Sequence, residues 1–468
     1  MTYQEAVAYL DSFVNYERVH QPDAMRDVRL ERMRQLCQRL GEPQRWFRSI
    51  VVTGTNGKGS ICAMLYSMLR ESELRVGLYT SPHLEHLRER VRIWDAGARF
   101  SERRHGEDWI GETEFAAAME QLRPALEEMR HESPDHAPTY FEALTALAFV
   151  HFRAREVDVA VLEVGLGGRL DATNVVDQAV SVIAPVAIDH ADVLGTDPVA
   201  IAREKAGIIK ARQVVITAPQ PPGVEEVLRE VCDAQGVPLV ECGRDLTVGI
   251  QRHDLEGLQV SVTGLRGIYD SLTLPLIGRH QAQNAAMAIG ALEALSSTGI
   301  PHAIVERGLA QVEWPGRLEV VSDAPLVLMD GAHNPHAAAA LRETLMELCQ
   351  GRAIHLLAGM SSDKSVEEIG QHVAGLAVSA TCTKSRHPRA LEPSELARRL
   401  FPFCPDVHVM PDAVDAYTYV LNTVSPHDVI VVTGSLFLVG ELRAALRYAH
   451  VRPRRAPQLE SVIIENTS

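Results

Sequence analysis

A glycine-rich segment, VVTGTNGKGS at residues 51–60, places a lysine and a serine where a strand would lead into a helix. Its spacing departs from the common phosphate loop, because Gly59 separates Lys58 from Ser60. Backbone N–H groups at such a turn and the dipole of the following helix favour a phosphate, and Lys58 adds a cation. A tight strand-to-helix turn with a surface lysine is the alternative, and the loop alone does not separate the two.

Ligands suited to a hard metal follow other apolar segments. Ser81 and His83 lie in YTSPHL after the apolar VGLY, and His190 ends AVSVIAPVAIDH. Glu142 interrupts the apolar helical stretch TYFEALTALAF, where an isolated carboxylate is costly unless it is paired, protonated or bound to metal. Because the carboxyl ends of parallel strands meet at one edge of a sheet, these groups could share a ligand. Helix capping for Glu142 and a satisfied interior histidine for His190 are the alternatives.

Two further segments of the first half carry glycines or charges. EVGLGGRLDATN contains Arg169 and Asp171, and it either approaches a ligand with its backbone or forms an ordered surface loop. Lys205 follows Glu204 in EKAGIIK. Composition alone favours a helix end with a salt bridge at that position.

The second half repeats the pattern of a strand followed by a polar turn. Asp330 and His333 follow PLVL in MDGAHNPHA, and Ser435 lies in VTGSLFLVGE, where it could cap a helix or contact an anion. Asn284 and Arg317 flank the junction between the two halves. Each of these signals is weak alone.

Short runs rich in Val and Ile, separated by segments with helical spacing, predict the elements that position these groups. The expected strands fall into two series, 49–52, 157–164, 179–188 and 213–218, then 325–332, 353–360, 407–410 and 428–435. Strand, glycine loop and helix in succession start a doubly wound unit, so the sequence predicts an α/β fold.

We predict two domains. Residues 1–300 should form an N-terminal, doubly wound domain like those of P-loop ATPases, and residues 301–468 a smaller, Rossmann-like α/β domain. The polar stretch 95–109 should be a surface insertion, and the tail after residue 451 should be loose.

Bulk properties exclude several classes of protein. A chain of 468 residues is too long to fold around one ordinary hydrophobic core. A net charge of −15 gives no general attraction to nucleic acid or to an anionic membrane. Seven scattered cysteines without a Cys-x-x-Cys pair argue against a disulfide framework. No secretory signal or long apolar run occurs, so we expect a cytoplasmic protein, with a monomer as the default.

Taken in order, these segments resemble the folylpolyglutamate synthase and dihydrofolate synthase family, within the Mur-ligase-type ATP-dependent amide ligases. The resemblance rests on TGTNGKGS, YTSPHL, TYFEALTALAF, EVGLGGRLDATN, the block from His190 to Lys210, the PGR turn and DGAHNPHA. In that family the phosphate loop normally carries a glycine after the lysine. The altered spacing is therefore expected.

The resemblance implies a site for ATP and Mg²⁺, with two ions. The residues implied to cradle the phosphates are Gly54, Thr55, Asn56, Gly57, Lys58, Gly59 and Ser60, and the implied metal ligands are Ser81, Glu142 and His190. Lys205 matches a lysine that can carry a carboxylate on its amine, as a carbamate. Nucleotide contacts are implied for Asn284, Arg317 and Asp330.

Catalytic roles are implied for Lys58, Lys205, Asp330 and His333. His333 and Ser435 match residues near the terminal phosphate or the incoming amino acid. DVRLERM resembles a segment that meets dihydropteroate, with plain helix surface as the alternative. The implied substrate contacts are Asp27, Val28, Arg29, Leu30, His83 and Ser435.

The implied reaction is the ATP-dependent addition of L-glutamate to dihydropteroate and to reduced folates, through an acyl phosphate. The implied partners are these small molecules alone, without nucleic acid or membrane. One alternative is a folylpolyglutamate synthase that acts only on tetrahydrofolates. Another is a nucleotide-binding module that ligates nothing.

Overall fold

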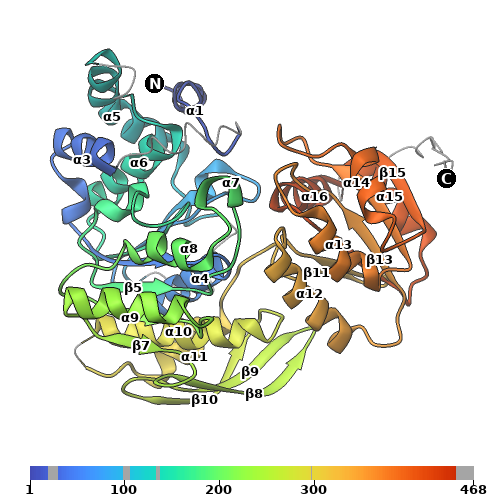
Figure 1. Cartoon of the computed structure of the whole chain (residues 1–468). Helices are drawn as coiled ribbons and strands as arrows, with labels where there is room; N and C mark the ends of the chain where they lie inside the picture. Colours follow the sequence, from blue (N-terminus) through green and yellow to red (C-terminus); the bar gives the residue numbers. More distant parts are fainter. Residues whose placement is uncertain (19–29, 98–105, 133–136, 297, 450–468) are drawn as a thin grey trace. The chain divides into compact units, whose positions relative to one another are not determined.

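The computed structural model of the protein describes residues 1–18, 30–97, 106–132, 137–296 and 298–449 (Figure 1). The chain divides into two compact units. The first comprises Met1–Arg252, Leu258–Pro275 and His280–Glu313, and the second comprises His253–Gly257, Leu276–Arg279 and Trp314–Ser468. The predicted division at residue 300 therefore falls inside the first unit, and two short earlier segments belong to the second. The tail after residue 451 and most of the 95–109 insertion lie outside the described residues.

A seven-stranded sheet forms the centre of the first unit, in the order β3-β2-β4-β1-β5-β6-β7. Its strands are β1 (Arg48–Thr53), β2 (Val76–Tyr79), β3 (Val91–Trp94), β4 (Val159–Glu163), β5 (Val180–Ile183), β6 (Val214–Thr217) and β7 (Leu239–Glu241). All neighbours pair in parallel except β3, which is antiparallel to β2. The central strands are buried along nearly their whole length, as expected for a parallel sheet with both faces covered.

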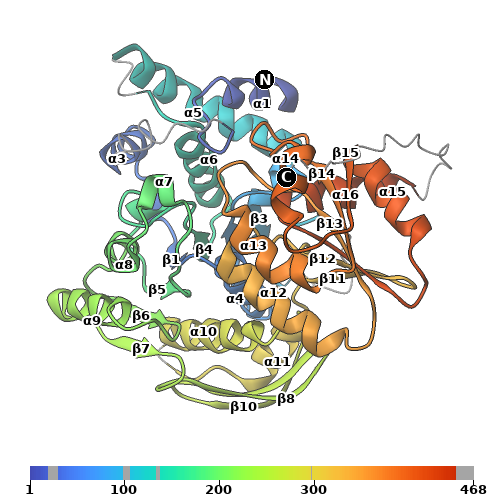
Figure 2. The ribbon, with the colours of Figure 1, turned by 45° about the vertical axis from the view of Figure 1, so that its right-hand side comes forward.

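Helices cover both faces of this sheet (Figures 1 and 2). One core joins the sheet to α1 (Tyr3–Asp11), α3 (Leu30–Arg39), α5 (Glu112–Glu132) and α6 (Tyr140–Ala154). α4 (Lys58–Arg70) packs with α10 (His280–Leu295) and α11 (His302–Ala310). The remaining helices are α7 (Ala191–Leu194), α8 (Pro198–Ala206) and α9 (Val224–Gln235).

Three strands that the sequence did not predict form a small antiparallel sheet, in the order β10-β9-β8. They are β8 (Thr247–Asp254), β9 (Gly257–Thr263) and β10 (Ile268–Leu274), and β10 packs against α11. Most residues of β8 are at least partly exposed, so its side chains lack the apolar run that identifies a buried strand.

The second unit has a six-stranded sheet in the order β11-β12-β16-β13-β14-β15, parallel except for β11. Its strands are β11 (Glu319–Asp323), β12 (Leu326–Met329), β13 (Ile354–Ala358), β14 (Ser379–Lys384), β15 (Val407–Asp412) and β16 (Val429–Thr433). Its helices are α12 (Pro335–Leu348), α13 (Val366–Val373), α14 (Pro393–Leu400), α15 (Ala413–Thr423) and α16 (Leu436–Ala449). The two-unit α/β architecture agrees with the predicted fold class.

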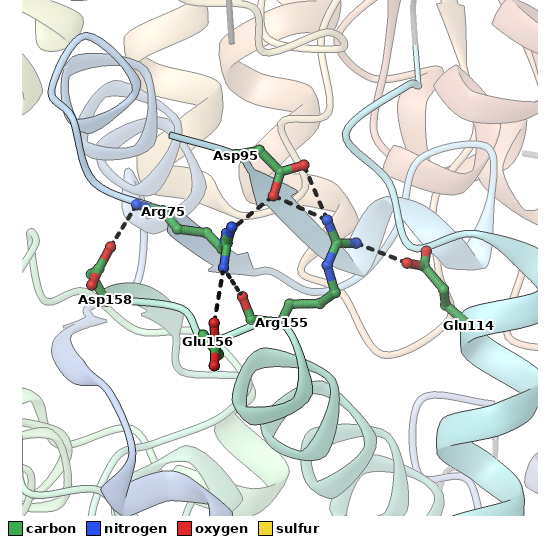
Figure 3. Close-up of polar contacts among 6 residues, drawn as sticks. All are labelled: Arg75, Asp95, Glu114, Arg155, Glu156 and Asp158. Atoms are coloured by element: carbon green, nitrogen blue, oxygen red, sulfur yellow. Dashed lines mark hydrogen bonds and ion pairs between the residues drawn. The ribbon is translucent and has the colours of Figure 1, made fainter. Parts of the chain in front are cut away.

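An ion-pair network ties the starts of β2 and β4 to the end of β3 (Figure 3). The carboxylate of Asp95 accepts hydrogen bonds from Arg75 at 3.1 Å and from Arg155 at 3.0 Å. Arg155 also bonds Glu114 at 2.8 Å, and the backbone N–H of Arg75 bonds Asp158 at 2.8 Å. The network therefore fixes the amino edge of the sheet, where the parallel strands begin.

Among the described helices, none is both long enough and apolar enough to cross a membrane. All seven cysteines are free thiols in buried positions.

Candidate active site

The glycine loop lies between the end of β1 and the start of α4. Gly54 and Gly57 have φ angles of 139° and 89°, which side chains rarely tolerate. A Cβ atom on Gly54 would lie 2.6 Å from the Cβ of Ala184, and one on Gly57 would lie 2.8 Å from Oδ1 of Asn284. Both glycines are therefore required by close neighbours. The predicted nucleotide contact Asn284 lies against the loop.

Two lysines converge on one backbone carbonyl of this loop. Lys58 Nζ donates to the carbonyl oxygens of Gly54 and Thr55, both at 3.2 Å, and Lys205 Nζ donates to that of Gly54 at 2.8 Å. In the described structure neither amine bonds a carboxylate. Burial, and then the charge of Lys58, lower the pKa of Lys205 to about 7. The carboxylates of Asp189, Glu204 and Asp171 act on Lys205 through their charge, while its amine bonds the carbonyl of the loop.

The loop is fixed to the segment that follows β5. The Thr55 N–H donates to the carbonyl of Pro185 at 2.8 Å, and its hydroxyl donates to that of Ala187 at 2.8 Å. This segment leads to His190, which has a φ of 51° and is partly exposed. A non-glycine residue in this left-handed conformation is uncommon, and such strain often marks a functional position.

Ser81 is linked to a carboxylate that the sequence reasoning missed. Glu163 is the last residue of β4 and is 5% exposed, and its Oε2 accepts the Ser81 N–H at 3.1 Å. Since β2 and β4 are parallel neighbours, both residues lie at the carboxyl edge of the sheet. The sequence signal that could have identified Glu163 is its position as the one charged residue, at the end of the otherwise apolar strand β4.

Glu142 takes part in a helix cap and an ion pair. Its carboxylate accepts two hydrogen bonds from Arg32 Nε, at 2.7 and 3.0 Å, and one from the Thr139 N–H at 2.7 Å. Thr139 and Glu142 form a capping box at the start of α6. Both oxygens are thus used by a helix cap and an ion pair, which speaks against Glu142 as a metal ligand and favours the capping alternative.

The glycine loop after β4 packs against the helix that carries Lys205. The buried Asp171 carboxylate accepts N–H groups of Gly165, Leu166 and Thr173 at 2.9 to 3.1 Å, which fixes the loop. A Cβ on Gly168 would lie 2.8 Å from the carbonyl oxygen of Lys205.

The salt bridge expected for Lys205 forms elsewhere. Arg169 pairs with Glu204 at 2.9 Å, at an exposed position, and Lys205 turns to the phosphate loop instead.

His83 is held by a buried arginine. Its Nδ1 accepts a hydrogen bond from Arg90 Nε at 2.9 Å. Burial, and then the charge of Arg90, lower the pKa of His83 to about 3, so the imidazole is neutral near pH 7.

Of the other predicted substrate contacts, Leu30 begins α3 and is buried. Asp27, Val28 and Arg29 lie outside the described residues.

In the second unit, the turn after β12 gathers three of the predicted residues. The Asp330 carboxylate accepts the N–H groups of Leu318 and Ala332, both at 2.8 Å. A Cβ on Gly331 would lie 2.5 Å from Nη1 of Arg317, so the guanidinium lies against this glycine. His333 Nδ1 lies 2.8 Å from the carbonyl oxygen of Gly331.

The turn after β16 meets the same turn. The Gly434 N–H donates to the carbonyl of Ala332 at 3.0 Å. Ser435 is 5% exposed, and its hydroxyl accepts the Phe437 N–H at 3.2 Å, so it caps α16. Four of the predicted residues, Arg317, Asp330, His333 and Ser435, are therefore brought to the carboxyl edge of the second sheet.

A second cluster at this edge was not predicted. Arg389, after β14, lies 3.6 Å from Asp363, after β13, and Lys364 Nζ lies 3.9 Å from the same carboxylate. Asp363 is 7% exposed, and its Oδ1 and the Nε of Arg389 are buried without hydrogen-bond partners. The unsatisfied Nε–H of Arg389 is a buried donor, and such a donor suits a bound carboxylate.

In the part of the chain that the structure describes, three or more His, Cys, Asp or Glu side chains nowhere gather closely enough to hold a metal. Ser81 and Glu163 are joined by a hydrogen bond, and Ser60 lies in the first turn of α4, which follows β1, the parallel neighbour of β4. Such a sparse oxygen set fits Mg²⁺, which keeps several waters and takes further ligands from substrate phosphates.

The sequence is similar to two known domain families. The pattern of the Mur ligase middle domain matches residues 113–292, and that of the Mur ligase, glutamate ligase domain matches residues 316–436. A dihydrofolate synthase/folylpolyglutamate synthase of Bacillus subtilis is 32% identical over 428 residues, which cover 89% of this chain and 95% of the relative. A protein of the same name from Escherichia coli is 33% identical over 397 residues, which cover 85% and 86%.

Solved structures agree with these relatives. Mycobacterium tuberculosis folylpolyglutamate synthase, complexed with ADP and AMPPCP, superposes with a TM-score of 0.84 at 32% identity, covering 97% of this chain and 99% of the other. E. coli FolC in complex with DHPP and ADP gives a TM-score of 0.82 at 29% identity, covering 96% and 99%.

Proposed function

We propose, since the chain belongs to the dihydrofolate synthase/folylpolyglutamate synthase family of Mur-type ligases, that it joins L-glutamate to dihydropteroate and to reduced folates with ATP. The observation that carries this proposal is the convergence of Lys58 and Lys205 on the Gly54 carbonyl, with neither amine bonded to a carboxylate. The Lys58 cation and the N–H groups of a glycine loop at a helix start suit the phosphates of a nucleotide, and the buried amine of Lys205, which bonds only the Gly54 carbonyl, is available for modification. Relatives have been solved in complex with ADP and AMPPCP and in complex with DHPP and ADP, which supports a nucleotide site together with a site for a second ligand.

The reaction proceeds in two displacements. A carboxylate oxygen of the pteridine acid attacks the γ-phosphorus of ATP, and the bond to the bridging oxygen breaks to release ADP. The amine of glutamate then attacks the carbonyl carbon of the acyl phosphate, loses a proton and expels phosphate. Lys58 offsets the negative charge on the transferred phosphoryl group, where positioning and electrostatics supply most of the catalysis.

Ser60, Ser81, Glu163 and His190 are the residues that we propose to hold Mg²⁺, with two ions. Glu163 replaces Glu142 in this set, because its carboxylate bonds the Ser81 N–H whereas that of Glu142 is occupied by Arg32. When bound, magnesium neutralises phosphate charge and orients the nucleotide.

Lys205 is proposed to carry a carbamate. Its pKa of about 7 leaves a substantial share of the amine neutral at neutral pH. The neutral amine adds to CO₂ and releases one proton, which converts the side chain into an anion. That anion would face the metal, and the lysine would no longer repel Lys58.

The second unit supplies the remaining contacts in this proposal. From the family resemblance, Arg317 and Asp330 are proposed as nucleotide contacts, and His333 and Ser435 as residues that act on the terminal phosphate or the incoming amino acid. We assign a carboxylate of glutamate to Arg389, because its Nε–H is buried without a hydrogen-bond partner.

We further propose a monomeric enzyme in the cytoplasm. The seven free cysteines are consistent with this compartment.

A folylpolyglutamate synthase that acts only on tetrahydrofolates is the second candidate, because a relative from Lacticaseibacillus casei, 34% identical over 449 residues, carries the name folylpolyglutamate synthase alone.

Product mass tests the proposal. The protein is incubated with ATP, Mg²⁺ and glutamate, with dihydropteroate in one tube and tetrahydrofolate in another. We expect glutamate addition in both tubes. Addition to tetrahydrofolate alone would favour the second candidate, and addition in neither tube would contradict the assignment of the substrate class.

A further inference from the structure

A fully buried arginine connects four segments of the first unit. Arg90 is 1% exposed and precedes β3. Its two terminal nitrogens bond the Glu17 carboxylate at 2.7 and 2.6 Å, its Nε bonds His83 at 2.9 Å, and its guanidinium lies 6.0 Å from the centre of the Tyr140 ring. A buried guanidinium with this set of partners has its geometry fixed from several sides.

The contact with His83 selects one form of the imidazole. Arginine has N–H donors and no acceptor, so the Nδ1 of His83 must accept. A protonated Nδ1 would place two hydrogens against each other. The proton of the neutral ring therefore lies on Nε2, which becomes a hydrogen-bond donor of defined orientation.

The same arginine joins the turn at residues 81–83 to the N-terminal segment. His83 lies two residues after Ser81, whose N–H bonds Glu163. Glu17 lies in the N-terminal segment, and the carbonyl of Val14 in that segment accepts the Tyr140 N–H at 3.0 Å. Tyr140 begins α6, the helix whose cap holds Arg32. Arg90 thus sets the distance between the turn at residues 81–83 and the N-terminal segment.

We propose that Arg90 is a positioning residue for the acid substrate, which holds His83 so that its Nε2–H donates to the carboxylate that attacks ATP. The proposal rests on the proposed ligase function. In this account Glu17 fixes Arg90, Arg90 fixes His83, and His83 orients the carboxylate. ATP and glutamate are bound by other residues.

Kinetics of four variants test this chain of contacts: Arg90→Lys, His83→Ala, the double variant, and Arg88→Lys as a control. Arg88 precedes Arg90 by two residues, bonds the carbonyl of Ile110 and is 27% exposed. Arg90→Lys keeps the charge beside Glu17 but loses the Nε donor to His83. We measure kcat and KM for dihydropteroate, ATP and glutamate, with melting temperatures to control for folding.

We expect Arg90→Lys to lower kcat/KM for dihydropteroate by about 10- to 100-fold, as for the loss of one charge-assisted hydrogen bond. The KM values for ATP and glutamate should stay within about twofold of wild type, and Arg88→Lys should resemble wild type. In the His83→Ala background, Arg90→Lys should add no further loss, because its effect passes through His83.

An equal loss for all three substrates, or an undiminished effect of Arg90→Lys in the His83→Ala background, would show that Arg90 supports the fold alone. If Arg90→Lys does not fold, Glu17→Gln takes its place, and the same selective loss is expected. Absence of product from the wild-type protein would instead contradict the ligase function itself, so the two failures are distinguishable.

Discussion

At the carboxyl edge of the first sheet, Lys58 and Lys205 donate to backbone carbonyls, whereas at the amino edge Arg75 and Arg155 share the carboxylate of Asp95 (Figure 3). The amino edge carries its counter-charges within the chain. The carboxyl edge holds two lysine amines close together, one of them buried, and in the described structure neither bonds a carboxylate. Such an arrangement is unfavourable until an anion arrives.

The sheet of the second unit shows the same difference. At its amino edge, His355 lies between Ser379 at 2.8 Å and Asp428 at 3.3 Å, so its polar atoms have partners within the chain. At its carboxyl edge, Asp363 and Arg389 retain buried atoms without hydrogen-bond partners. For these groups, the polar atoms at the amino edges have partners within the chain, whereas Arg389 at a carboxyl edge keeps a buried donor that a substrate could use.

The largest effect should come from Lys58→Ala. Its amine bonds carbonyls of its own loop, so the fold loses little, but the phosphoryl group loses its nearest cation. We expect kcat/KM to fall by at least about 100- to 1,000-fold with a melting temperature close to that of wild type. Steady-state kinetics and thermal unfolding check this. If Lys58→Ala unfolds or retains its activity, the proposed difference between the carboxyl edge, which serves the reaction, and the amino edge, which serves the fold, is contradicted.

The pair Glu163→Gln and Glu142→Gln separates a site carboxylate from a structural one. Glu163→Gln should lower kcat by about 100-fold and raise the Mg²⁺ concentration needed for half-maximal activity. Glu142→Gln breaks the ion pair with Arg32 and should cost about 3 kcal/mol of unfolding free energy with a smaller loss of activity. Magnesium titrations and urea unfolding measure both effects. The reverse pattern would restore Glu142 as the ligand.

A more selective effect is expected from Arg389→Gln in the second unit. The KM for glutamate should rise by about 10- to 100-fold, while the KM for ATP stays near the wild-type value. Arg386→Gln is the matched control, because Arg386 lies three residues earlier and is 84% exposed beside Glu441. Equal changes in both variants would argue against the glutamate assignment.

A pH effect should distinguish the buried lysine of the carboxyl edge. The pKa of Lys205 is about 7 in the folded chain and about 10.4 when unfolded, so between these values the unfolded state binds more protons. The free energy of unfolding should therefore rise from pH 7 to pH 10. Lys210, with its pKa lowered by burial to about 8, adds to the rise.

In Lys205→Met this increase should shrink by about 1 to 3 kcal/mol, measured by urea unfolding in buffers free of CO₂. An unchanged slope would mean that Lys205 is not a buried, proton-losing group.

The smallest effect should come from the amino edge. Asp95 is 43% exposed, so Asp95→Asn should lower the free energy of unfolding by about 1 kcal/mol or less, and by less still at high salt. The kcat should not change. Activity assays and urea unfolding at two salt concentrations test this, and a large loss of kcat would show that the amino edge also serves the reaction.

Much of the scaffold could be predicted from the sequence, because buried parallel strands are apolar along their whole length. The expected strands at 49–52 and 213–218 correspond to β1 and β6 within one residue at each end. The expected strand at 179–188 ends early, at Ile183, because Pro185 and Ala187 turn their carbonyls to Thr55. The strands β8 to β10 were missed because many of their side chains are partly exposed, so their sequences lack the apolar run of a buried strand.

Residues that depend on tertiary partners could not be identified in the same way. The roles proposed for Glu163, Arg90 and Arg389 depend on neighbouring strand ends and on burial, which a linear pattern does not report. Glu142 is different, because Thr139 three residues before it gives the sequence signature of a capping box. That signal favoured a helix cap from the start.

The most direct test of the account is the fate of one oxygen atom. Dihydropteroate labelled with ¹⁸O in its carboxylate is incubated with the protein, ATP, Mg²⁺ and glutamate, and the released phosphate is analysed by mass spectrometry. If the carboxylate attacks the phosphoryl group at the loop of Lys58, each phosphate released with the amide product carries one ¹⁸O from the acid. Phosphate without the label, formed alongside that product, would contradict the acyl-phosphate mechanism.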